Sequence, residues 1–291
     1  MLDGVDKLVI VGTGLLGASV GLAAKAAGFR GRIVGVARRE EVGRVALERG
    51  CVDEISLDAG EAAKGAGLIV VAVPLGGFEA VFHAIREPVV ASSAVVTDVG
   101  STKAGVMRLA QEIFGQGAKR VIGAHPMAGS EQAGPEAATA ELLRGKPCVI
   151  TAGQQDDADA IELVEQLWRG VGMSVVRMDP DEHDRCMAAV SHLPHLAAVG
   201  LIGVVSELGG WQVASTGLKD TSRLASSNPP MRADIIHENR EALAEVLRGY
   251  AKRITAMAEL VERDDQTRLL ELLESAKAKR DTWLAEREAE S

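Results

Sequence analysis

Short apolar runs recur through the first 178 residues and predict buried strands. Each run is four to six residues long and ends at or just before Gly, Pro or a polar residue. Runs that are apolar at successive positions, rather than at alternate ones, are typical of parallel strands covered on both faces. The predicted strands are residues 7–11, 33–37, 68–73, 94–97, 120–123, 148–151 and 174–177.

Segments of helical length separate these runs, for example residues 15–27, 104–114 and 157–170. Alternation of strand and helix predicts a doubly wound α/β sheet. From residue 181 onward no strand pattern appears, and the composition, rich in Ala, Leu, Glu and Arg, favours helix. We therefore expect a sheet domain over residues 1–180 and an all-helical domain over residues 181–291.

One apolar stripe in the helical part has coiled-coil spacing. Its members are separated alternately by four and three residues, as in the a and d positions of a heptad repeat. Such a stripe can pack inside its own subunit or against a second copy. A small helical domain has limited room to bury it internally, so we expect it to help form a homodimer. The stripe comprises Leu243, Leu247, Tyr250, Ile254, Met257 and Val261.

Charge and composition restrict the partners. The chain has 32 Lys and Arg residues against 41 Asp and Glu residues, a net charge of −9, and only 3% aromatic residues. An acidic chain with few aromatic rings is poorly suited to bind nucleic acid. An anionic small molecule remains a possible ligand if a local basic pocket receives it.

Nothing in the apolar pattern predicts a membrane segment, because runs such as residues 68–73 are far shorter than the roughly 18 residues that suggest a spanning helix. The N-terminus lacks the basic region of a secretory signal. The three cysteines, Cys51, Cys148 and Cys186, are widely spaced and fit buried thiols better than a disulfide or zinc framework. We therefore expect a cytoplasmic protein.

A glycine motif follows the first predicted strand and opens a helix. It reads G-x-G-x-x-G, in which the glycines allow a tight turn, a close approach of backbone to a pyrophosphate, and close packing of helix on strand. The phosphates would lie at the helix N-terminus. The sequence thus predicts a Rossmann-type dinucleotide site formed by Gly12, Thr13, Gly14, Leu15, Leu16 and Gly17, with Val73 and Pro74 at the end of a neighbouring strand.

The end of the second strand indicates which dinucleotide binds. Sites for NAD usually place an acidic residue about 20 residues beyond the glycines, where it bonds the ribose hydroxyl. Here that position holds Ala37, followed by Arg38 and Arg39. Two guanidinium groups can bind a 2′-phosphate, so we expect NADP to be favoured over NAD. Alternatively, one arginine stacks on adenine in an NAD enzyme and the other is solvated.

Two clusters at predicted strand ends carry groups suited to chemistry. In Asp98-Val99-Gly100-Ser101-Thr102-Lys103, Ser101 can face a ligand, or Ser101 or Thr102 can cap the following helix. In the second cluster, His125 follows a strand and precedes a Pro- and Gly-containing loop. An imidazole held there is well placed for proton transfer near neutral pH, although a lone histidine is more often structural.

The helical part supplies the local basic pocket that an anion requires. His192 and His195 lie in one short segment, and Lys219 and Arg223 lie in another. Arg223 is the best candidate for a carboxylate, because guanidinium binds it bidentately. His192 can instead pack at a helix start. No nearby cysteine or carboxylate set supports a metal site, so we expect none.

Five motifs in this order resemble the prephenate/arogenate dehydrogenases of tyrosine biosynthesis. They are GTGLLG, DVGSTK, GAHPMAGSEQAG, SHLPH and KDTSR. The resemblance covers essentially the whole chain, and the HPMAG and SHLPH motifs are far more specific than the glycines. It implies a Rossmann-type domain, a helical domain that dimerises, and oxidative decarboxylation of a cyclohexadienyl ring with hydride transfer to NAD(P).

The resemblance also assigns roles. His125 matches the histidine that accepts the proton of the C4 hydroxyl, and Ser101 matches the serine that shares this hydroxyl and orients the histidine. Arg223 matches an arginine that binds a substrate carboxylate, and His195 a histidine of members that use prephenate. Glu131 matches an acidic residue that gates the site in some members, with Lys219 or Arg223 as its partner.

Two departures affect the carboxylate pocket. Lys219 stands where several relatives have Arg, and residues 215–218 lack the GGGF-type run common in the family. We expect prephenate as substrate, because a donor at His195 suits its pyruvyl group, and arogenate is the alternative. Nothing after Arg263 suggests a regulatory domain, so any inhibition by tyrosine would act at the active site.

Two rival functions remain. Imine or β-hydroxyacid oxidoreductases of the same fold usually rely on a lysine in the first long helix of the helical domain, and residues 187–201 contain none. A regulator that binds NADP without turnover is a second rival, which the grouping of His125, Ser101 and Arg223 disfavours.

Overall fold

A computed structural model describes residues 2, 4–129, 132–153 and 155–289. The chain forms two compact units, Met1–Asn239 and Arg240–Ser291. The first contains the sheet together with the helical segment that follows it, and the second is a pair of helices. The sequence predicts a different division, into domains over residues 1–180 and 181–291, and that division stays a prediction.

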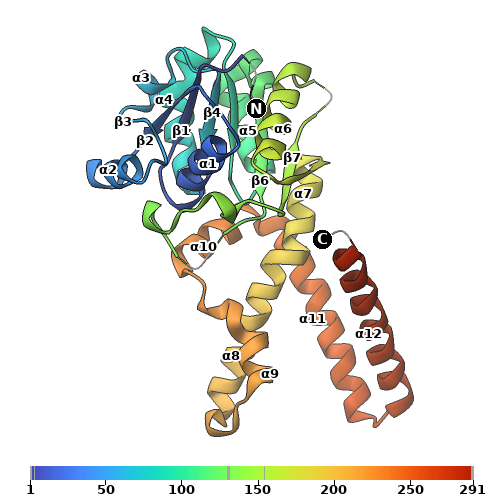
Figure 1. Ribbon diagram of the computed structural model, residues 1–291. Helices are drawn as coiled ribbons and strands as arrows, with labels where there is room; N and C mark the ends of the chain where they lie inside the picture. Colours follow the sequence, from blue (N-terminus) through green and yellow to red (C-terminus); the bar gives the residue numbers. More distant parts are fainter. Residues whose placement is uncertain (1, 3, 130–131, 154, 290–291) are drawn as a thin grey trace. The chain divides into compact units, whose positions relative to one another are not determined.

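Within the described residues, the strands form one eight-stranded sheet in the order β3-β2-β1-β4-β5-β6-β7-β8 (Figure 1). All neighbouring strands pair in parallel except β6 and β7, which pair antiparallel. The strands are β1 (Lys7–Val11), β2 (Arg32–Val36), β3 (Glu54–Ser56), β4 (Leu68–Val71), β5 (Val95–Asp98), β6 (Val121–Pro126), β7 (Pro147–Thr151) and β8 (Ser174–Met178).

The sheet is predominantly parallel, as the sequence predicts, but β7 and β8 run opposite to the other six strands. The described part of the connection between β6 and β7 contains only the short turns η3 (Pro135–Ala137) and η4 (Ala140–Leu142). A parallel return needs a crossover, usually a helix, which this connection does not supply. Between β7 and β8 the helix α6 (Ala158–Gly170) provides one, and those two strands are parallel.

Helices cover both faces of the sheet and explain the uninterrupted apolar runs. In β1, Leu8 and Ile10 belong to a core cluster with Trp168, whereas Val9 and Val11 belong to a second cluster on the other face. Residues 8–11 of the strand are therefore all buried, although they alternate between the two faces. The covering helices are α1 (Leu15–Ala26), α2 (Glu40–Glu48), α3 (Ala59–Ala63), α4 (Phe78–Val90), α5 (Ala104–Phe114) and α6, with the turns η1 (Leu75–Gly77) and η2 (Gly115–Arg120).

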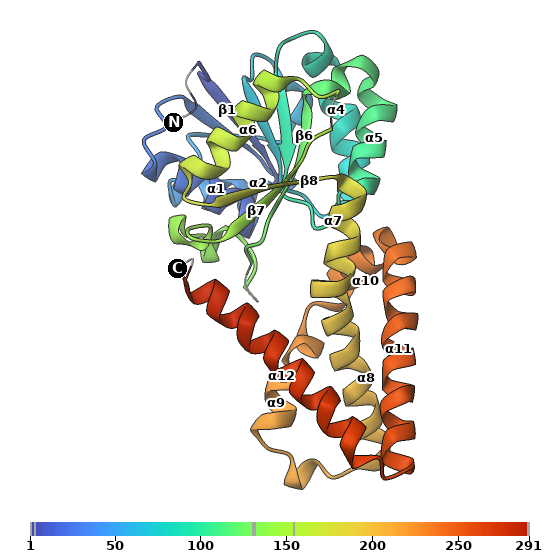
Figure 2. The same ribbon diagram turned by 90° about the vertical axis from the view of Figure 1, so that its right-hand side faces the viewer.

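After β8 the chain is helical, as predicted. Helix α7 (Pro180–Met187) runs through a π-helical turn, η5 (Ala188–His192), into α8 (Leu193–Leu208), as Figure 2 shows. Pro194 lies just after this turn. A proline inside a helix lacks the N–H group and crowds the carbonyl four residues back, and a π-turn is one way to relieve this. The rest of this unit comprises η6 (Trp211–Val213), α9 (Thr216–Ser222), η7 (Arg223–Ser226) and α10 (Pro229–Glu238).

The continuous helix Pro180–Leu208 contains a longer apolar segment than the short runs in the sequence indicate. Its most apolar 18-residue window has a mean hydropathy of 1.7 and is 22% buried, so by length and composition it passes the test for a membrane span. A single such helix is weak evidence for a membrane, because helices at the centre of soluble proteins pass the same test. A helix that is apolar on all sides is normally buried against other protein or in a membrane.

The second unit consists of α11 (Arg240–Glu262) and α12 (Gln266–Ala289), which pack against each other. Asp264, with φ of 51°, makes the turn between them. The predicted apolar stripe lies on α11, where Tyr250, Ile254 and Val261 are exposed in the single chain. Exposed Leu270, Leu273 and Trp283 extend the apolar surface onto α12.

Candidate active site

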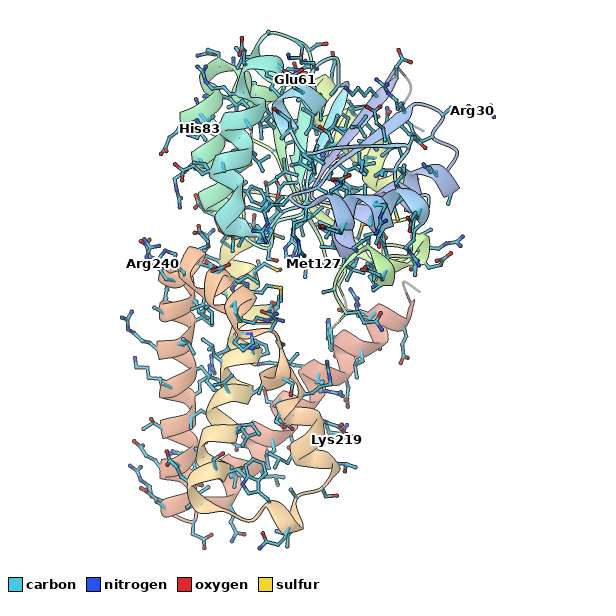
Figure 3. All side chains as sticks on the ribbon, turned by 90° about the vertical axis from the view of Figure 1, so that its left-hand side faces the viewer. Arg30, Glu61, His83, Met127, Lys219 and Arg240 are labelled. Atoms are coloured by element: carbon cyan, nitrogen blue, oxygen red, sulfur yellow. The ribbon has the colours of Figure 1, made fainter. Side chains whose placement is uncertain are left out.

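Four parallel strands bring the predicted site residues to one edge of the sheet. Gly12, Ser101 and His125 each lie at or just beyond the carboxyl end of β1, β5 or β6, and Val73 follows β4. Met127, two residues after His125, marks this edge in Figure 3. Open α/β sheets bind their ligands at the carboxyl ends of the strands.

The first and third glycines of the motif are required by close contacts. Gly12 has φ of 104°, and a Cβ atom there would lie 2.4 Å from the carbonyl oxygen of Ala72. A Cβ at Gly17 would lie 1.9 Å from the carbonyl oxygen of Gly12. The turn is thus folded tightly against the end of β4, and a Cβ at Gly12 would also lie 3.0 Å from Cγ1 of Val73.

The second glycine leaves space instead. Gly14 is the N-cap of α1, where no side chain caps the helix, and a Cβ there would meet no atom within 4 Å. The first turn of α1 has no acidic residue, and the neighbouring Thr13 hydroxyl is buried without a partner among the described residues. Uncapped N–H groups facing open space fit the phosphates of a dinucleotide.

The strand β2 ends at Val36, one residue before the predicted end at Ala37. Ala37 is buried there and its N–H donates to the carbonyl of Ser56, while Arg38 and Arg39 are exposed. Glu40 and Glu41 follow in the first turn of α2. The end of the strand therefore presents two guanidinium groups and an alanine where NAD sites usually have a carboxylate.

Asp98 ties together the two loops that carry Ser101 and His125. Its carboxylate accepts hydrogen bonds from the backbone N–H of Gly100 (2.6 Å) and of Ala124 (3.1 Å) and forms an ion pair with Lys103. Asp98 and Lys103 are both buried, and a buried charge needs such a partner. Ser101 lies half-buried between these anchor points.

His125 is held by a chain of groups that sequence reasoning missed. Its Nδ1 lies 2.9 Å from Nε2 of His183, and Nδ1 of His183 lies 2.7 Å from the carboxylate of Asp184. The same carboxylate accepts the backbone N–H groups of Lys103 (2.8 Å) and Ala104 (2.9 Å) and so caps helix α5. The N-cap of α5 is Lys103, so neither Ser101 nor Thr102 caps this helix.

Burial controls the protonation of these groups. Burial, then the nearby charges of His183, Lys103 and His192, hold the pKa of His125 well below 6.5. Burial by itself raises the pKa of Asp184, but hydrogen bonds from His183 and from the N–H groups of Lys103 and Ala104 outweigh it and lower that pKa. At neutral pH the chain therefore ends in a carboxylate, and His125 is an uncharged base.

A second cluster lies on the helical segment. His192 is buried, and its Nδ1 lies 3.2 Å from the amide nitrogen of Asn239, which also donates to the carbonyl of Asp184 (2.7 Å). Burial and the charge of Arg232 lower the pKa of His192 to about 4. His195 is 7% exposed, and burial followed by the Arg232 charge lowers its pKa as well.

Two polar atoms of this cluster are buried with no hydrogen-bond partner among the described residues. They are Nδ1 of His195 and Nε of Arg232. Buried polar atoms are normally paired, so unpaired ones indicate a missing ligand or water. A carboxylate would satisfy both atoms and the Arg232 charge. Arg232 was missed from the sequence because nothing in its helix marks it apart from other charged residues.

The remaining predicted residues lie nearby or outside the described chain. Lys219 is exposed on α9 (Figure 3), and Arg223 is exposed at the start of η7. Both elements contact α8, which carries His195. Glu131 lies outside the described residues. Within the part of the chain that is described, no three His, Cys, Asp or Glu side chains are grouped so as to hold a metal ion.

Two family models together match most of the chain. "Prephenate dehydrogenase, nucleotide-binding domain" matches residues 20–177, and "Prephenate dehydrogenase, dimerization domain" matches residues 179–275. Among curated proteins, the chain is 29% identical to a prephenate dehydrogenase of Bacillus subtilis, over 95% of this chain and 76% of that protein. It is 30% identical to a cyclohexadienyl dehydrogenase of Zymomonas mobilis, over 94% of each.

Solved structures agree. Prephenate dehydrogenase from Aquifex aeolicus, in complex with hydroxyphenyl propionate and NAD+, superposes with a TM-score of 0.87 at 30% identity, over 94% of this chain and 97% of that one. Synechocystis arogenate dehydrogenase gives 0.83 at 26% identity, over 95% and 99%. The dinucleotide turn, the basic cluster and these matches lead to one conclusion: the chain belongs to the prephenate dehydrogenase family and is an NAD(P)-dependent oxidoreductase.

Proposed function

We propose that this enzyme converts prephenate to 4-hydroxyphenylpyruvate and CO2 in tyrosine biosynthesis, with NADP+ as the preferred hydride acceptor. The observation that carries the proposal is a half-buried, uncharged His125 at the ligand-binding edge of the sheet, in the same unit as a basic cluster with unpaired buried atoms. The named substrates of the matched relatives support the same chemistry.

The proposed reaction needs a proton acceptor but consumes no proton. Hydride leaves C4 of the ring, the ring carboxylate leaves as CO2, and the ring becomes aromatic. The nicotinamide, when bound, supplies the hydride acceptor. Nε2 of His125 accepts the C4 hydroxyl proton as that oxygen gains carbonyl character, and returns it to give the phenol. Ser101, on the neighbouring loop, shares this hydroxyl and orients the histidine.

The basic cluster favours prephenate over arogenate. Prephenate carries a pyruvyl side chain, whereas arogenate carries an additional ammonium group. Arg232 and the buried donor His195 provide positive charge and unpaired hydrogen-bonding atoms for a carboxylate. An ammonium placed beside them would be repelled, because like charges in a poorly solvated site are costly. Arg223 serves as a further carboxylate partner, as the family resemblance implies.

Initial rates with both substrates test this choice. We expect a higher kcat/KM for prephenate than for arogenate on the purified protein. The His195→Asn variant, which removes the ring but keeps a polar side chain, should narrow the ratio. A preference for arogenate in the wild type would overturn the proposed role of His195, and absence of turnover with either substrate, alongside tight NADP binding, would instead favour a regulator.

The cofactor preference rests on the end of β2. Arg38 and Arg39 can both approach a 2′-phosphate, and no carboxylate at position 37 repels one. In Ala37→Asp, a new carboxylate would repel the 2′-phosphate and accept the 2′-hydroxyl of NAD. The NADP/NAD ratio of kcat/KM should therefore fall. An unchanged ratio would show that the two arginines do not select the phosphate.

We further propose that the working enzyme is a cytoplasmic homodimer. Helix α8 is apolar on all sides and little covered within the single chain, and the stripe on α11 is likewise exposed. Both lie in the segment that matches a dimerization domain. A second copy of the chain is the partner that would bury these surfaces without a membrane.

A further inference from the structure

We propose that His183 and Asp184 form a relay with His125, which holds the His125 ring in its proton-accepting form and shares the charge that develops on it. The inference rests on the proposed function for the identity of the proton donor, the C4 hydroxyl. The relay itself is a property of the protein alone. His183 and Asp184 act through His125, so they are positioning residues.

The relay begins at a carboxylate whose orientation is fixed. Asp184 accepts the N–H groups of Lys103 and Ala104 at the start of α5, at 2.8 and 2.9 Å. Two backbone donors from one helix end prevent the carboxylate from turning, and the positive end of the helix dipole favours its ionised form. An ionised carboxylate can only accept hydrogen bonds. The group 2.7 Å away, Nδ1 of His183, must therefore carry a hydrogen.

The tautomers of both rings follow from that hydrogen. An uncharged His183 with hydrogen on Nδ1 has a lone pair on Nε2. This lone pair lies 2.9 Å from Nδ1 of His125, which must then be the donor. His125 is left with its lone pair on Nε2. One carboxylate thus determines, through two rings, that the nitrogen of His125 facing away from His183 is the acceptor.

The same chain can carry the charge that forms during the reaction. When Nε2 of His125 takes the hydroxyl proton, its Nδ1 proton can move to Nε2 of His183. The imidazolium then lies on His183, beside the Asp184 carboxylate, and His125 is uncharged. Only N–H and O–H bonds are made and broken, and the reverse transfers return the proton to the phenol oxygen. No proton needs to leave the buried site.

The surrounding charges make such a relay useful. A cation on His125 would face the positive charge of Lys103, and His192 also disfavours it. Asp98 is already paired with Lys103 and accepts two backbone N–H groups. The Cys148 thiol, whose pKa burial raises to well above neutral, offers no charge. Asp184 is thus the carboxylate hydrogen-bonded into the chain, and a shift of charge toward it lowers the cost of protonating His125.

The first test needs no substrate. Nitrogen-15 NMR of the full chain labelled at histidine distinguishes a ring nitrogen that carries hydrogen from one that does not. With six histidines in the chain, each resonance is assigned by its loss in a single His→Asn variant. We expect hydrogen on Nδ1 and none on Nε2 for both His125 and His183. Hydrogen on Nε2 of His125 in the wild type would overturn the relay, whatever the enzyme acts on.

The second test separates the relay from simple helix capping. Asp184→Asn keeps the shape and an acceptor oxygen for one of the two α5 N–H groups but removes the charge and the second acceptor. His183→Gln retains an acceptor for His125 yet cannot hold a proton. We expect kcat to fall on the order of 10²-fold or more in each, by analogy with the loss of an orienting carboxylate in a catalytic triad, with KM within about twofold. Asp181→Asn, an exposed carboxylate on the same helix, should leave kcat unchanged.

Stability and kinetics then give separate answers. A role limited to capping predicts a lower Tm for Asp184→Asn, with normal kcat in the fraction that remains folded, and that result would contradict the relay. If Asp184→Asn does not fold, the relay is still tested by the tautomer of wild-type His125 and by the kinetics of His183→Gln. Absence of wild-type turnover with prephenate would overturn the proposed function but not the relay, which the NMR measurement tests alone.

Discussion

The most consequential residue in the fold is a histidine that is kept uncharged by its surroundings. Burial and three nearby basic groups lower the pKa of His125, and the hydrogen bond to His183 fixes its ring. A base must be deprotonated to act, so the acid limb of the rate profile reports this pKa. The groups that face it are His183, Asp184, Lys103, Asp98, His192 and Cys148.

The first prediction concerns this base. His125→Asn should lower kcat by on the order of 10²- to 10⁴-fold, the usual contribution of a positioned proton acceptor, with little change in KM. In the wild type, kcat/KM should stay level as pH falls from 8 to 6.5 and drop only at lower pH, because protonation of His125 removes the acceptor there. Steady-state rates across this pH range check both. An acid limb at or above pH 6.5 would contradict the burial argument.

Arg232 carries the second prediction. If it binds a substrate carboxylate, Arg232→Gln should raise KM for prephenate roughly tenfold or more, since a hydrogen bond to a charged group contributes about 1.5–3 kcal/mol. Arg232→Lys retains the charge and should have a smaller effect. The kcat of both variants should change less than KM. A normal KM in Arg232→Gln would show that the unpaired atoms of this cluster are satisfied by water instead.

The sequence predicts a site residue when the pattern that marks it is local. It does not predict one whose hydrogen-bond partners are distant in sequence. His125 and the glycines follow a strand directly, so their place at the sheet edge could be inferred. His183 and Asp184 contact partners 58 and 81 residues away in sequence, and no spacing rule connects such positions. Arg232 has the same difficulty, because its importance lies in burial and in an unpaired nitrogen.

At the scale of elements, the glycine turn shows how one motif contains two kinds of requirement. Gly17 is needed because a side chain there would collide with backbone, whereas Gly14 is needed only to leave space. The backbone of Gly14, with φ of −75° and ψ of −165°, is open to any residue. We therefore expect Gly17 to be required for folding and Gly14 for binding of the dinucleotide.

The third prediction follows. Gly17→Ala should lower Tm or prevent folding, because its Cβ would lie 1.9 Å from the Gly12 carbonyl oxygen. Gly14→Ala should leave Tm unchanged in the absence of cofactor but raise the Kd for NADP+, because the methyl group occupies the space before the helix N-terminus. Thermal unfolding and cofactor titration measure the two effects. Equal behaviour of the two variants would contradict this division.

The elements themselves could largely be predicted, but not all of their directions. Strands buried on both faces produce uninterrupted apolar runs, so their positions were readable. An apolar run carries no information about direction, and the antiparallel pairing of β6 with β7 depends on the connection between them. The short strand β3 was missed because only three residues form it. The π-turn before Pro194 likewise has no sequence pattern of its own.

At the scale of the whole molecule, the uncovered apolar helices call for a partner. On α8, Val204 and Leu208 are 55% and 83% exposed.

For a fourth prediction, the wild type should sediment as a dimer, and Val204→Asp should shift it toward monomer, because a buried charge in an apolar interface is costly. Leu57→Asp, an exposed leucine within the sheet part, is the matched control. Analytical ultracentrifugation in detergent-free buffer measures the oligomeric state of the wild type and of both variants. A wild-type monomer, or insolubility without detergent, would contradict the proposal.

The cap on α5 links the order of synthesis to the order of assembly. The first turn of that helix is completed by a carboxylate that follows it by 80 residues, on a helix beyond the end of the sheet. All eight strands of the sheet are synthesised before Asp184, so until that residue is added the N-terminal end of α5 lacks this cap beside the active-site loop. A fragment cut at residue 180 would keep the glycine turn and lose the cap. Such a fragment should bind the dinucleotide while its α5 terminus exchanges amide protons freely, whereas a fragment reaching residue 239 should protect them.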